Sequence, residues 1–443
     1  MLAAMSSPAP RSSSQATAVA RDRGDACPGS LRLHAADDGA LARIRIPGGV
    51  LDVRQADALS AAARDLGDGE LHLTSRGNVQ LRGLRDDCGA QLATILDSVG
   101  LLPSHTHERV RNVVASPLSG LDGAGFADVR PWLTGLDAAL CVSETARALS
   151  GRFLFALDDG RGDVAGLDAD VTVRAAADGA ALLSLGSSAE AVAVPGADAP
   201  RSALIAAETF LTSAAERTET GRQVWRVAEL GVPAEELTRT VAERLAAAGV
   251  DCAIRVRELA VTEGPLPGVS GDALSVHIPL GRLSARQWDE LTRTAERHGG
   301  ELRLTPWRGA VVPTPGPDPS EAAYALARLA AAGLVTSPDS PWLRVGACIG
   351  RPGCAKSHAD VRADAARALD AAAGAPLPLY WSGCERRCGH PRTERIDVVA
   401  APEGGYRLTA TTATDVTDPP SPVLLDDPSH LATALVALTD RTA

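Results

Sequence analysis

Long apolar runs are absent from this 443-residue sequence. The first 25 residues have no continuous apolar core of the kind found in signal peptides, and no later run is long enough to cross a bilayer. We therefore expect a cytoplasmic protein that does not engage a membrane, with residues 1–25 forming a disordered tail.

Basic charge is also scarce, because the formal net charge is -11 at pH 7. A nucleic-acid partner is not expected, since such partners select a basic face. Lysine is almost missing: of the 44 basic residues only Lys356 is a lysine, and it lies two positions after Cys354. No strand is followed by a GxGxxG turn and a helix, so the chain is not expected to bind NADH itself.

An internal repeat divides the chain into related halves. The segment "IPGGVLDVRQADAL" (46–59) aligns with "IPLGRLSARQWDEL" (278–291) at eight identical positions of fourteen. "ELHLTSRG" (70–77) aligns with "ELRLTPWRG" (301–309) after one inserted residue. A single separation of about 231 residues indicates a duplicated half rather than a solenoid.

Each copy predicts an apolar strand, a Pro-Gly turn, an amphipathic helix and a second, alternating strand. In the first copy, Leu71 and Leu73 face one way and His72 the other, which predicts a half-buried strand. Antiparallel strands backed by helices belong to the α+β class, and two copies can pair about a pseudo-twofold axis. The expected order is repeat, mixed domain, repeat and cysteine-bearing mixed domain, over residues 26–105, 106–255, 256–335 and 336–443.

Four cysteines form two closely spaced pairs, Cys348 with Cys354 and Cys384 with Cys388. In a reducing cytosol such pairs indicate metal binding or redox chemistry. Five residues separate the first pair, whereas structural zinc sites usually have two to four, so an iron–sulfur cluster is favoured over zinc. A helix is expected to begin near Cys354 and to direct its N-terminus at the cluster. The other cysteines are interpreted as small buried hydrophobes: Cys27, Cys88, Cys141 and Cys252.

Together with the cysteine spacing, the segments "HLTSRGNVQL", "LRLTPWRG" and "VRNVVASPLSGLDG" resemble the nitrite/sulfite reductase family from Cys27 onward. The resemblance implies an α+β fold in which two ferredoxin-like half-domains and two mixed α/β domains surround a tetrapyrrole. It implies that the four cysteines hold a [4Fe-4S] cluster. By the same similarity, Cys388 matches the cysteine that bridges the cluster and the iron of sirohaem.

Arginines at matched positions are the expected tetrapyrrole contacts. Arg45, Arg76 and Arg111 match basic residues of the family, and a guanidinium pairs with a carboxylate through two hydrogen bonds. The alternative is that they are solvated arginines on strands. Arg152 in "SGRFLFALDDG" matches the first of two lysines that bind the small oxyanion in the reductases, and Leu154 occupies the position of the second.

Loss of that second cation argues against six-electron reduction of sulfite or nitrite, which needs proton delivery and anion stabilisation. The segments "CPGSLRL" and "GCERRCGHP" are instead similar to the cobalamin-biosynthesis branch of the family. In that branch the tetrapyrrole precorrin-3A is the substrate; it is hydroxylated with dioxygen, and a ring acetate closes to a lactone. The alternatives are a sirohaem-dependent sulfite or nitrite reductase and a non-catalytic carrier whose cysteines bind zinc.

The resemblance also implies an external electron donor, either ferredoxin or an NADH-dependent reductase, and allows a separate mononuclear non-haem iron. His105 and His107 are the candidate catalytic ligands of that iron, with solvated loop histidines as the alternative. His358 and His390 flank the cysteine pairs, where they could tune the cluster's potential or relay protons.

Overall fold

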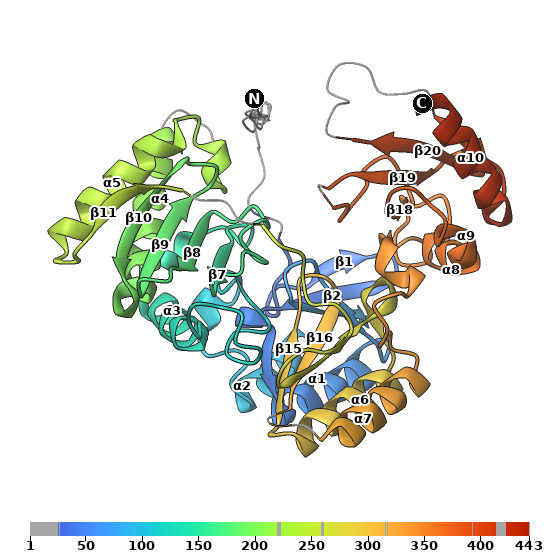
Figure 1. Cartoon of the computed structure of the whole chain (residues 1–443), viewed down its shortest axis with the longest axis horizontal. Coiled ribbons are helices and arrows are strands. Elements are labelled where there is room, and N and C mark those ends of the chain that lie inside the picture. The colour runs from blue at the N-terminus through green and yellow to red at the C-terminus, as the bar shows by residue number, and fades with distance from the viewer. Residues whose placement is uncertain are drawn as a thin grey trace, which may run out of the picture.

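The computed structural model describes Asp25 and residues 27–218, 223–257, 261–314, 316, 318–391, 393–412 and 422–442. The expected N-terminal tail lies outside the described residues, apart from Asp25. The described strands form three five-stranded sheets and one six-stranded sheet. Figure 1 shows the two half-domains at the base of the molecule, with a mixed domain rising on either side.

Each half-domain sheet contains one short strand from the other half. The first has the order β1 (His34–Ala36), β2 (Gly39–Ile44), β5 (Val79–Leu84), β4 (Leu71–Leu73) and β14 (Arg282–Leu283). The second has the order β12 (Gly268–Val269), β13 (Ala273–His277), β16 (Gly309–Pro313), β15 (Glu301–Leu304) and β3 (Val50–Asp52). Since β14 pairs with β4 and β3 with β15, the two copies of the repeat exchange equivalent strands.

The Pro-Gly turns make this exchange possible. They form the 3-10 helices η1 (Pro47–Gly49) and η6 (Pro279–Gly281), which lead into the exchanged strands. A Cβ on Gly49, whose φ is 72°, would lie 1.9 Å from the carbonyl oxygen of Leu304. A Cβ on Gly281 would lie 3.2 Å from the carbonyl oxygen of Leu73, the equivalent residue of the other half. The last residue of each turn, Gly49 or Gly281, therefore packs against the partner strand, where a side chain has no room.

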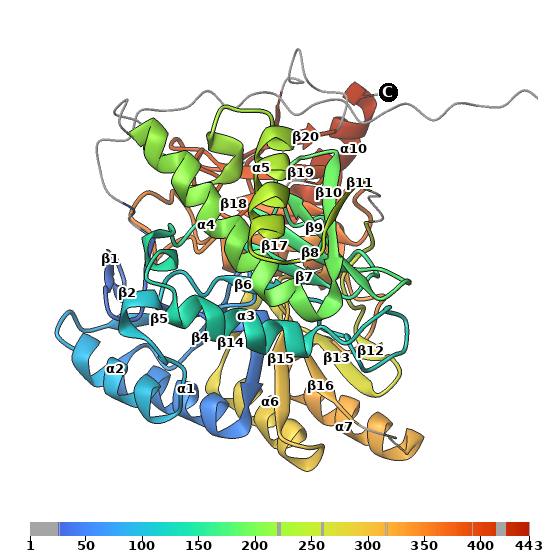
Figure 2. The same ribbon diagram turned by 90° about the vertical axis from the view of Figure 1, so that its left-hand side faces the viewer.

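Four helices cover the outer face of both sheets: α1 (Val53–Leu66), α2 (Gly89–Ser98), α6 (Ala285–Arg297) and α7 (Pro319–Ala331) (Figures 1 and 2). The equivalent helices α1 and α6 each begin with a capping box, Asp52 with Gln55 and Ser284 with Gln287. The buried indole of Trp288 donates a hydrogen bond to the carbonyl of Ala56 at 2.8 Å, so the halves share one core.

The first mixed domain has a sheet of parallel strands followed by antiparallel ones. Its parallel strands are β6 (Val113–Ala115), β7 (Phe155–Asp158) and β8 (Val171–Ala175). The antiparallel strands are β9 (Ala180–Leu185), β10 (Glu190–Pro195) and β11 (Ala253–Val256). Its helices are α3 (Arg130–Val142), α4 (Ala199–Thr218) and α5 (Ala234–Ala247).

The second mixed domain repeats this plan. Strands β17 (Val345–Ala347), β18 (Leu379–Ser382) and β19 (Arg395–Ala400) are parallel, and β20 (Tyr406–Thr411) and β21 (Val423–Leu425) continue the sheet antiparallel. The helices are α8 (Val361–Arg367), α9 (Leu369–Ala372) and α10 (Leu431–Thr442). The remaining 3-10 helices are η2 (His105–His107), η3 (Ala146–Ala148), η4 (Gly196–Asp198), η5 (Val227–Glu229), η7 (Pro341–Arg344) and η8 (Pro428–His430).

The predicted α+β architecture is confirmed, and two local expectations are wrong. Strand β4 is buried on both faces, with His72 only 5% exposed, because the cysteine-bearing domain covers its second face. No helix begins near Cys354; α8 begins at Val361, where the carboxylate of Asp360 caps the N–H of Ala363. Within the described ranges, no helix combines the length and the apolar character needed to cross a bilayer.

Candidate functional site

The parallel strands of the second mixed domain place Cys348 and Cys384, one cysteine from each pair, at the same edge of the sheet. Cys348 directly follows β17, and Cys384 lies two residues after the end of the neighbouring β18. The carboxyl ends of adjacent parallel strands meet at one edge of a sheet. At this edge the N–H of Cys348 donates to the carbonyl of Trp381 at 2.9 Å, and the N–H of Gly383 donates to Cys348 Sγ at 3.2 Å. Cys388 is exposed at the rim.

The thiols are close enough to oppose one another's ionisation. Burial raises the pKa of Cys348, and negative charge on Cys388 and Cys384 raises that pKa further. The N–H groups of Gly383 and Gly350 act in the opposite direction. Bound metal cations stabilise coordinating thiolates, so this group of thiols suits a centre that supplies positive charge.

The spacing of the sulfurs does not suit a single zinc ion. In the part of the chain that the structure describes, three potential ligand atoms lie within 4.8 Å of one another only in the group Asp68, Glu70 and His72. No three of the four cysteine sulfurs are therefore that close. Zinc–sulfur bonds of about 2.3 Å in a tetrahedron hold sulfurs about 3.8 Å apart. In a four-iron cluster each thiolate binds a different iron, so a wider arrangement fits that group.

Two arginines that the sequence reasoning missed lie beside the cysteines. Arg362 of α8 donates through Nε to the carbonyl oxygen of Cys348 at 3.3 Å. Arg308 lies in the turn between β15 and β16 with a φ of 57°, and a Cβ on Gly346 would lie 3.3 Å from its Nη1. Neither guanidinium has a carboxylate within 4.0 Å among the described residues. Arg308 is the repeat counterpart of Arg76, so the internal repeat itself was the signal for it.

A second basic group lies in the first half-domain and unites two predicted residues, Arg45 and Arg76. Arg45 is only 3% exposed, which contradicts the alternative of a solvated strand arginine. Its Nη2 donates to the carbonyl of Gly151 and to Cys27 Sγ, each at 3.2 Å. Cys27 therefore lies beside arginines, and the expectation that it packs in apolar surroundings is wrong. Burial, with the positive charges of Arg226 and Arg45, lowers the pKa of Arg76 to about 10.

Among the described residues, Arg76 has no carboxylate within 4.0 Å, whereas its neighbour Arg226 pairs with Asp170 at 2.6 Å and Arg45 is bonded to Gly151 and Cys27. A partly buried cation surrounded by other cations is an unfavourable arrangement for the protein alone. An anionic ligand would relieve it, and a carboxylate can accept two hydrogen bonds from one guanidinium.

The other two predicted arginines are placed differently. Arg111 is buried and binds Asp137 through two hydrogen bonds of 2.7 Å each, while its Nη1 donates to the carbonyl of Leu101. Its guanidinium is therefore engaged within the protein. Arg152 is exposed and lies over the ring of Trp225, 4.8 Å from the ring centroid.

The expected iron ligands His105 and His107 are not arranged as a metal site. His105 is exposed and binds the carboxylate of Asp97 at 2.9 Å. Both ring nitrogens of the buried His107 are occupied, Nδ1 by the hydroxyl of Ser104 at 2.7 Å and Nε2 by the carbonyl of Ser143 at 2.9 Å. Neither ring has a free lone pair directed at a shared position.

The histidines that flank the cysteines are both exposed. The backbone N–H of His358 donates to the carbonyl of Gly383 at 2.8 Å, and His390 Nδ1 donates to the carbonyl of Arg387 at 2.6 Å. These contacts order the loops that carry the cysteines.

The group of Asp68, Glu70 and His72 is also a poor cation site. An arginine can only donate, so the 3.2 Å contact from Arg362 makes His72 Nδ1 an acceptor and places the imidazole proton on Nε2. That nitrogen is buried without a hydrogen-bond partner, 3.6 Å from Asp68 and 3.9 Å from Glu70. Since Arg282 already neutralises Glu70, the field here does not favour a divalent ion.

Leu154 lies in a small apolar cluster rather than in a polar cavity. It is 3% exposed and packs with Val114, Ala156, Val164 and Ala169. Trp307, from the turn that also carries Arg308, packs against this cluster. One turn of the second half-domain therefore contacts both mixed domains, through Trp307 on one side and Arg308 on the other.

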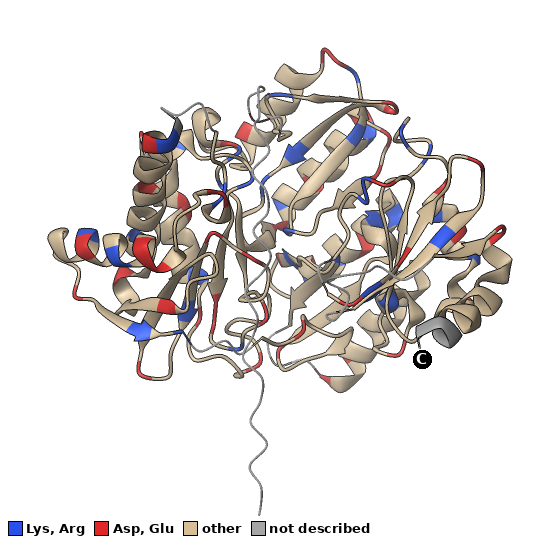
Figure 3. Ribbon diagram, turned by 90° about the horizontal axis from the view of Figure 1, so that it is seen from above, with Lys and Arg blue, Asp and Glu red and all other residues tan. Residues whose placement is uncertain are grey.

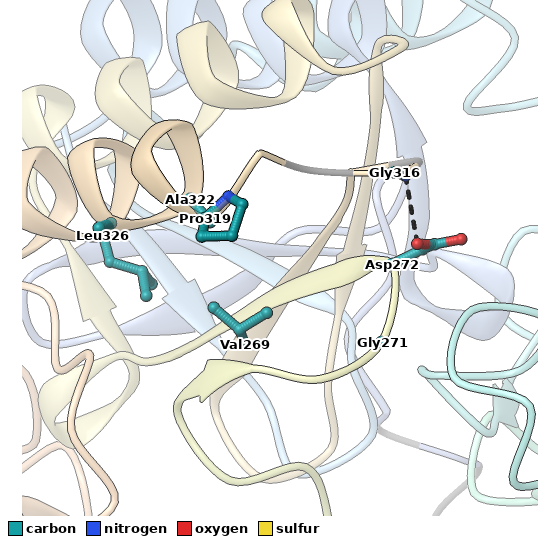
Figure 4. Close-up of a pocket in the computed structure, with 8 residues that line it drawn as sticks. Val269, Gly271, Asp272, Gly316, Pro319, Ala322 and Leu326 are labelled. Carbon is teal, nitrogen blue, oxygen red and sulfur yellow. Dashed lines mark hydrogen bonds between the residues drawn. The ribbon is translucent and has the colours of Figure 1, made fainter.

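The pocket drawn in Figure 4 is mainly apolar, and its lining residues are not among the cysteines, arginines and histidines described above. It is lined by Val269, Gly271, Asp272, Gly316, Pro319, Ala322, Ala323 and Leu326. Its one charged residue, Asp272, accepts a hydrogen bond from the N–H of Gly316 at 3.2 Å. None of the candidate site residues lines it. Acidic and basic positions are interspersed over the view in Figure 3.

Comparison with known proteins defines the class. The model of the nitrite/sulfite reductase ferredoxin-like half domain matches residues 34–97 and 267–332, the two copies of the repeat. The structure of the Mycobacterium tuberculosis NirA protein has the same fold, with a TM-score of 0.64 and 17% identity over 89% of this chain and 79% of that one. The chain therefore contains two half-domains of the kind found in nitrite and sulfite reductases, within a fold shared with NirA.

Relatives with two different activities are similar to it at nearly the same level. The ferredoxin–nitrite reductase of Synechococcus elongatus is 28% identical over 403 residues, which cover 82% of this chain and 76% of that protein. The precorrin-3B synthase of a Sinorhizobium species is 27% identical over 399 residues, which cover 87% of this chain and 83% of that protein. Identity alone therefore does not choose between the two activities.

Proposed function

We propose that the chain is an oxygen-dependent hydroxylase of precorrin-3A that carries one [4Fe-4S] cluster. The ligands of the cluster are Cys348, Cys354, Cys384 and Cys388. The placement of Cys348 and Cys384 at one sheet edge supports this assignment, as does the electrostatic contact of both Cys384 and Cys388 with Cys348. Cys354 is assigned from its spacing to Cys348 in the sequence. When bound, the cluster passes electrons one at a time from an external donor. The donor is a ferredoxin or an NADH-dependent reductase.

Leu154 is the observation that favours this activity over reduction of sulfite or nitrite. Its side chain is buried among apolar residues and under Trp307, so this position offers neither charge nor a proton to a small oxyanion. Arg152, at the other matched position, is exposed and stacked on Trp225. The reductases place cations at both positions, and reduction by six electrons depends on such groups.

Arg76 is the proposed contact for a carboxylate of the macrocycle. No carboxylate lies within 4.0 Å of it among the described residues, whereas the nearby Arg45 is already bonded to Gly151 and Cys27. A polycarboxylate substrate provides the negative charge that this group lacks. We place the substrate at the seam of the half-domains, where a Cβ on Gly77, next to Arg76, would lie 3.2 Å from the carbonyl oxygen of Leu304.

The reaction balances as follows. One atom of dioxygen enters the macrocycle as a hydroxyl group and the other leaves as water, with two electrons and two protons supplied from outside. The carboxyl group of a ring acetate then adds across a carbon–carbon double bond of the macrocycle, so the C–O bond of the lactone forms, the π bond is lost, and the proton moves to the other carbon. The external donor supplies the electrons, so the balance requires no bound nicotinamide. A mononuclear iron remains a prediction for which the described residues provide no clear ligand set.

The test is anaerobic purification followed by iron, acid-labile sulfide and pigment analysis, and then a reaction with precorrin-3A, a reductant and ¹⁸O₂. We expect four irons and four sulfides per chain, no permanently bound haem-type pigment, and one labelled oxygen atom in the product. Label arriving only from water would falsify the proposal. A haem-type spectrum with rapid sulfite or nitrite reduction would establish the sirohaem-dependent alternative. Stoichiometric zinc without sulfide would establish a zinc-binding carrier.

A further inference from the structure

Arg362 joins the cysteine loop to the first half-domain. Its Nε donates to the carbonyl oxygen of Cys348 at 3.3 Å, and its Nη1 lies 3.2 Å from His72 Nδ1. Cys348 follows β17 and His72 is the central residue of β4, so the contact spans two domains. No carboxylate lies within 4.0 Å of this guanidinium among the described residues, although Arg282 and Arg82 nearby each pair with one. The positive charge of Arg362 is therefore not neutralised by a carboxylate and can interact with another anionic group.

His72 holds this charge in place without neutralising it. Because Nδ1 accepts from Arg362, the imidazole keeps its single proton on Nε2 and is uncharged. The ring is buried in β4, and its Nε2–H faces the carboxylates of Asp68 and Glu70 at 3.6 and 3.9 Å. The hydrogen bond from Arg362 and the burial of the ring in β4 set its orientation. Burial also lowers the pKa of His72, in agreement with a neutral ring.

The anionic group that Arg362 would stabilise is the cluster. A cubane cluster with four thiolate ligands carries net negative charge, and one more electron adds to it. Positive charge and hydrogen-bond donors near the ligands stabilise the reduced form. Arg308 is a second cation without a carboxylate partner among the described residues. It lies against Gly346 and near Tyr380.

We propose that Arg362, held by His72, raises the reduction potential of the cluster and so sets how readily it accepts electrons from the donor. The inference rests on the proposed function only through the presence of the cluster. His72 is a positioning residue in it. It acts through Arg362, because its own ring is neutral.

The experiment is an anaerobic redox titration of the cluster-containing protein, followed by electron paramagnetic resonance and visible absorption. At a fixed potential, Arg362→Gln should lower the ratio of reduced to oxidised cluster at least tenfold, which for one electron is a shift of 59 mV. Arg362→Lys keeps the charge and should stay within about threefold of the wild type. The matched control is Arg367→Gln on the same helix, where Asp364 already neutralises the arginine. That control should leave the ratio unchanged.

Substitution of His72 separates placement from charge. His72→Leu removes the acceptor and should lower the ratio of reduced to oxidised cluster in the same direction as Arg362→Gln. His72→Gln offers a carbonyl oxygen to the guanidinium and should restore it. An intact cluster with an unchanged ratio in Arg362→Gln overturns the inference.

Loss of the cluster in both Arg362→Gln and Arg362→Lys also overturns the inference, because it would identify a purely structural brace. If the wild-type protein itself contains no iron and sulfide, the proposed function fails instead, so the two failures are distinguishable.

Discussion

Arg76 and Arg111 were predicted to play the same role, and the structure gives them opposite environments. Arg111 is paired with Asp137 through two hydrogen bonds, whereas Arg76 lies near other cations and has no carboxylate within 4.0 Å among the described residues. Replacing each with glutamine should therefore separate stability from substrate binding. We expect Arg76→Gln to weaken binding of precorrin-3A without destabilising the protein, and Arg111→Gln to do the reverse.

The magnitudes follow from these contacts. Burial and neighbouring cations lower the pKa of Arg76 from its usual value to about 10. At about 1.36 kcal/mol per pKa unit, folding disfavours its charged form by about 3 kcal/mol. That cost is fully present at pH 7, because pH 7 is below the pKa in both the folded and the unfolded protein. Glutamine avoids the charge but is still a buried polar group, so the net gain should be about 1 kcal/mol.

Arg111→Gln loses a charge-assisted pair and leaves Asp137 without its partner. Breaking a fully buried pair costs about 3–5 kcal/mol. The side chain of Asp137 is 23% exposed, so water compensates in part and we expect a loss of about 2 kcal/mol. In the bound state, loss of a charged hydrogen-bond donor at Arg76 should cost about 1.5–3 kcal/mol, or about 10- to 150-fold in affinity.

The assay is anaerobic thermal unfolding of the cluster-containing proteins together with equilibrium titration of precorrin-3A. Wild-type iron and sulfide content in both variants is the control for a general folding defect. The reasoning is refuted if Arg76→Gln binds the substrate as tightly as the wild type, or if it unfolds at as low a temperature as Arg111→Gln.

Three further outcomes are expected. Gly49→Ala places a Cβ 1.9 Å from a carbonyl oxygen of the other half-domain at a φ of 72°. It should lower the free energy of unfolding by more than about 2 kcal/mol in denaturant titrations. The control Gly69→Ala, at a φ of 82° with nothing within 4 Å of the Cβ, should lower it by only about 1 kcal/mol. Cys348→Ser should abolish the visible absorption of the cluster, whereas Cys27→Ser should retain it, and retention in both would remove the proposed ligand set. Leu154→Lys buries an ammonium group in an apolar cluster, so it should destabilise the protein by more than about 2 kcal/mol and confer no sulfite reduction with an artificial electron donor.

The repeat is the part of the fold that local sequence determined most fully. The spacing of apolar residues, the Pro-Gly turns and the capping residues before α1 and α6 act over a few neighbouring positions, so they are visible without a partner. The two close pairs of cysteines were also visible in the sequence, because paired metal ligands often lie a few residues apart on one loop. These signals were enough for the fold class, and the assignment of the four cysteines as cluster ligands stays a prediction.

The exchange of β3 and β14 between the half-domains was decided only by tertiary structure. Each strand is two or three residues long, and its partner lies in the other copy of the repeat, so no local pattern specifies the pairing. The same is true of His72, whose alternation with Leu71 and Leu73 predicted exposure. Burial followed from the docking of Arg362, which lies 290 positions further along the chain.

Tertiary contacts likewise decided which of the predicted arginines are free to bind an anion. Arg45, Arg76 and Arg111 share a residue type, and sequence motifs therefore treated them alike. What distinguishes them is whether a carboxylate or a carbonyl from a distant segment reaches the guanidinium, as Asp137 reaches Arg111 and Gly151 reaches Arg45. An arginine's charge is determined by its chemistry, but its availability depends on the neighbours that the folded chain brings to it.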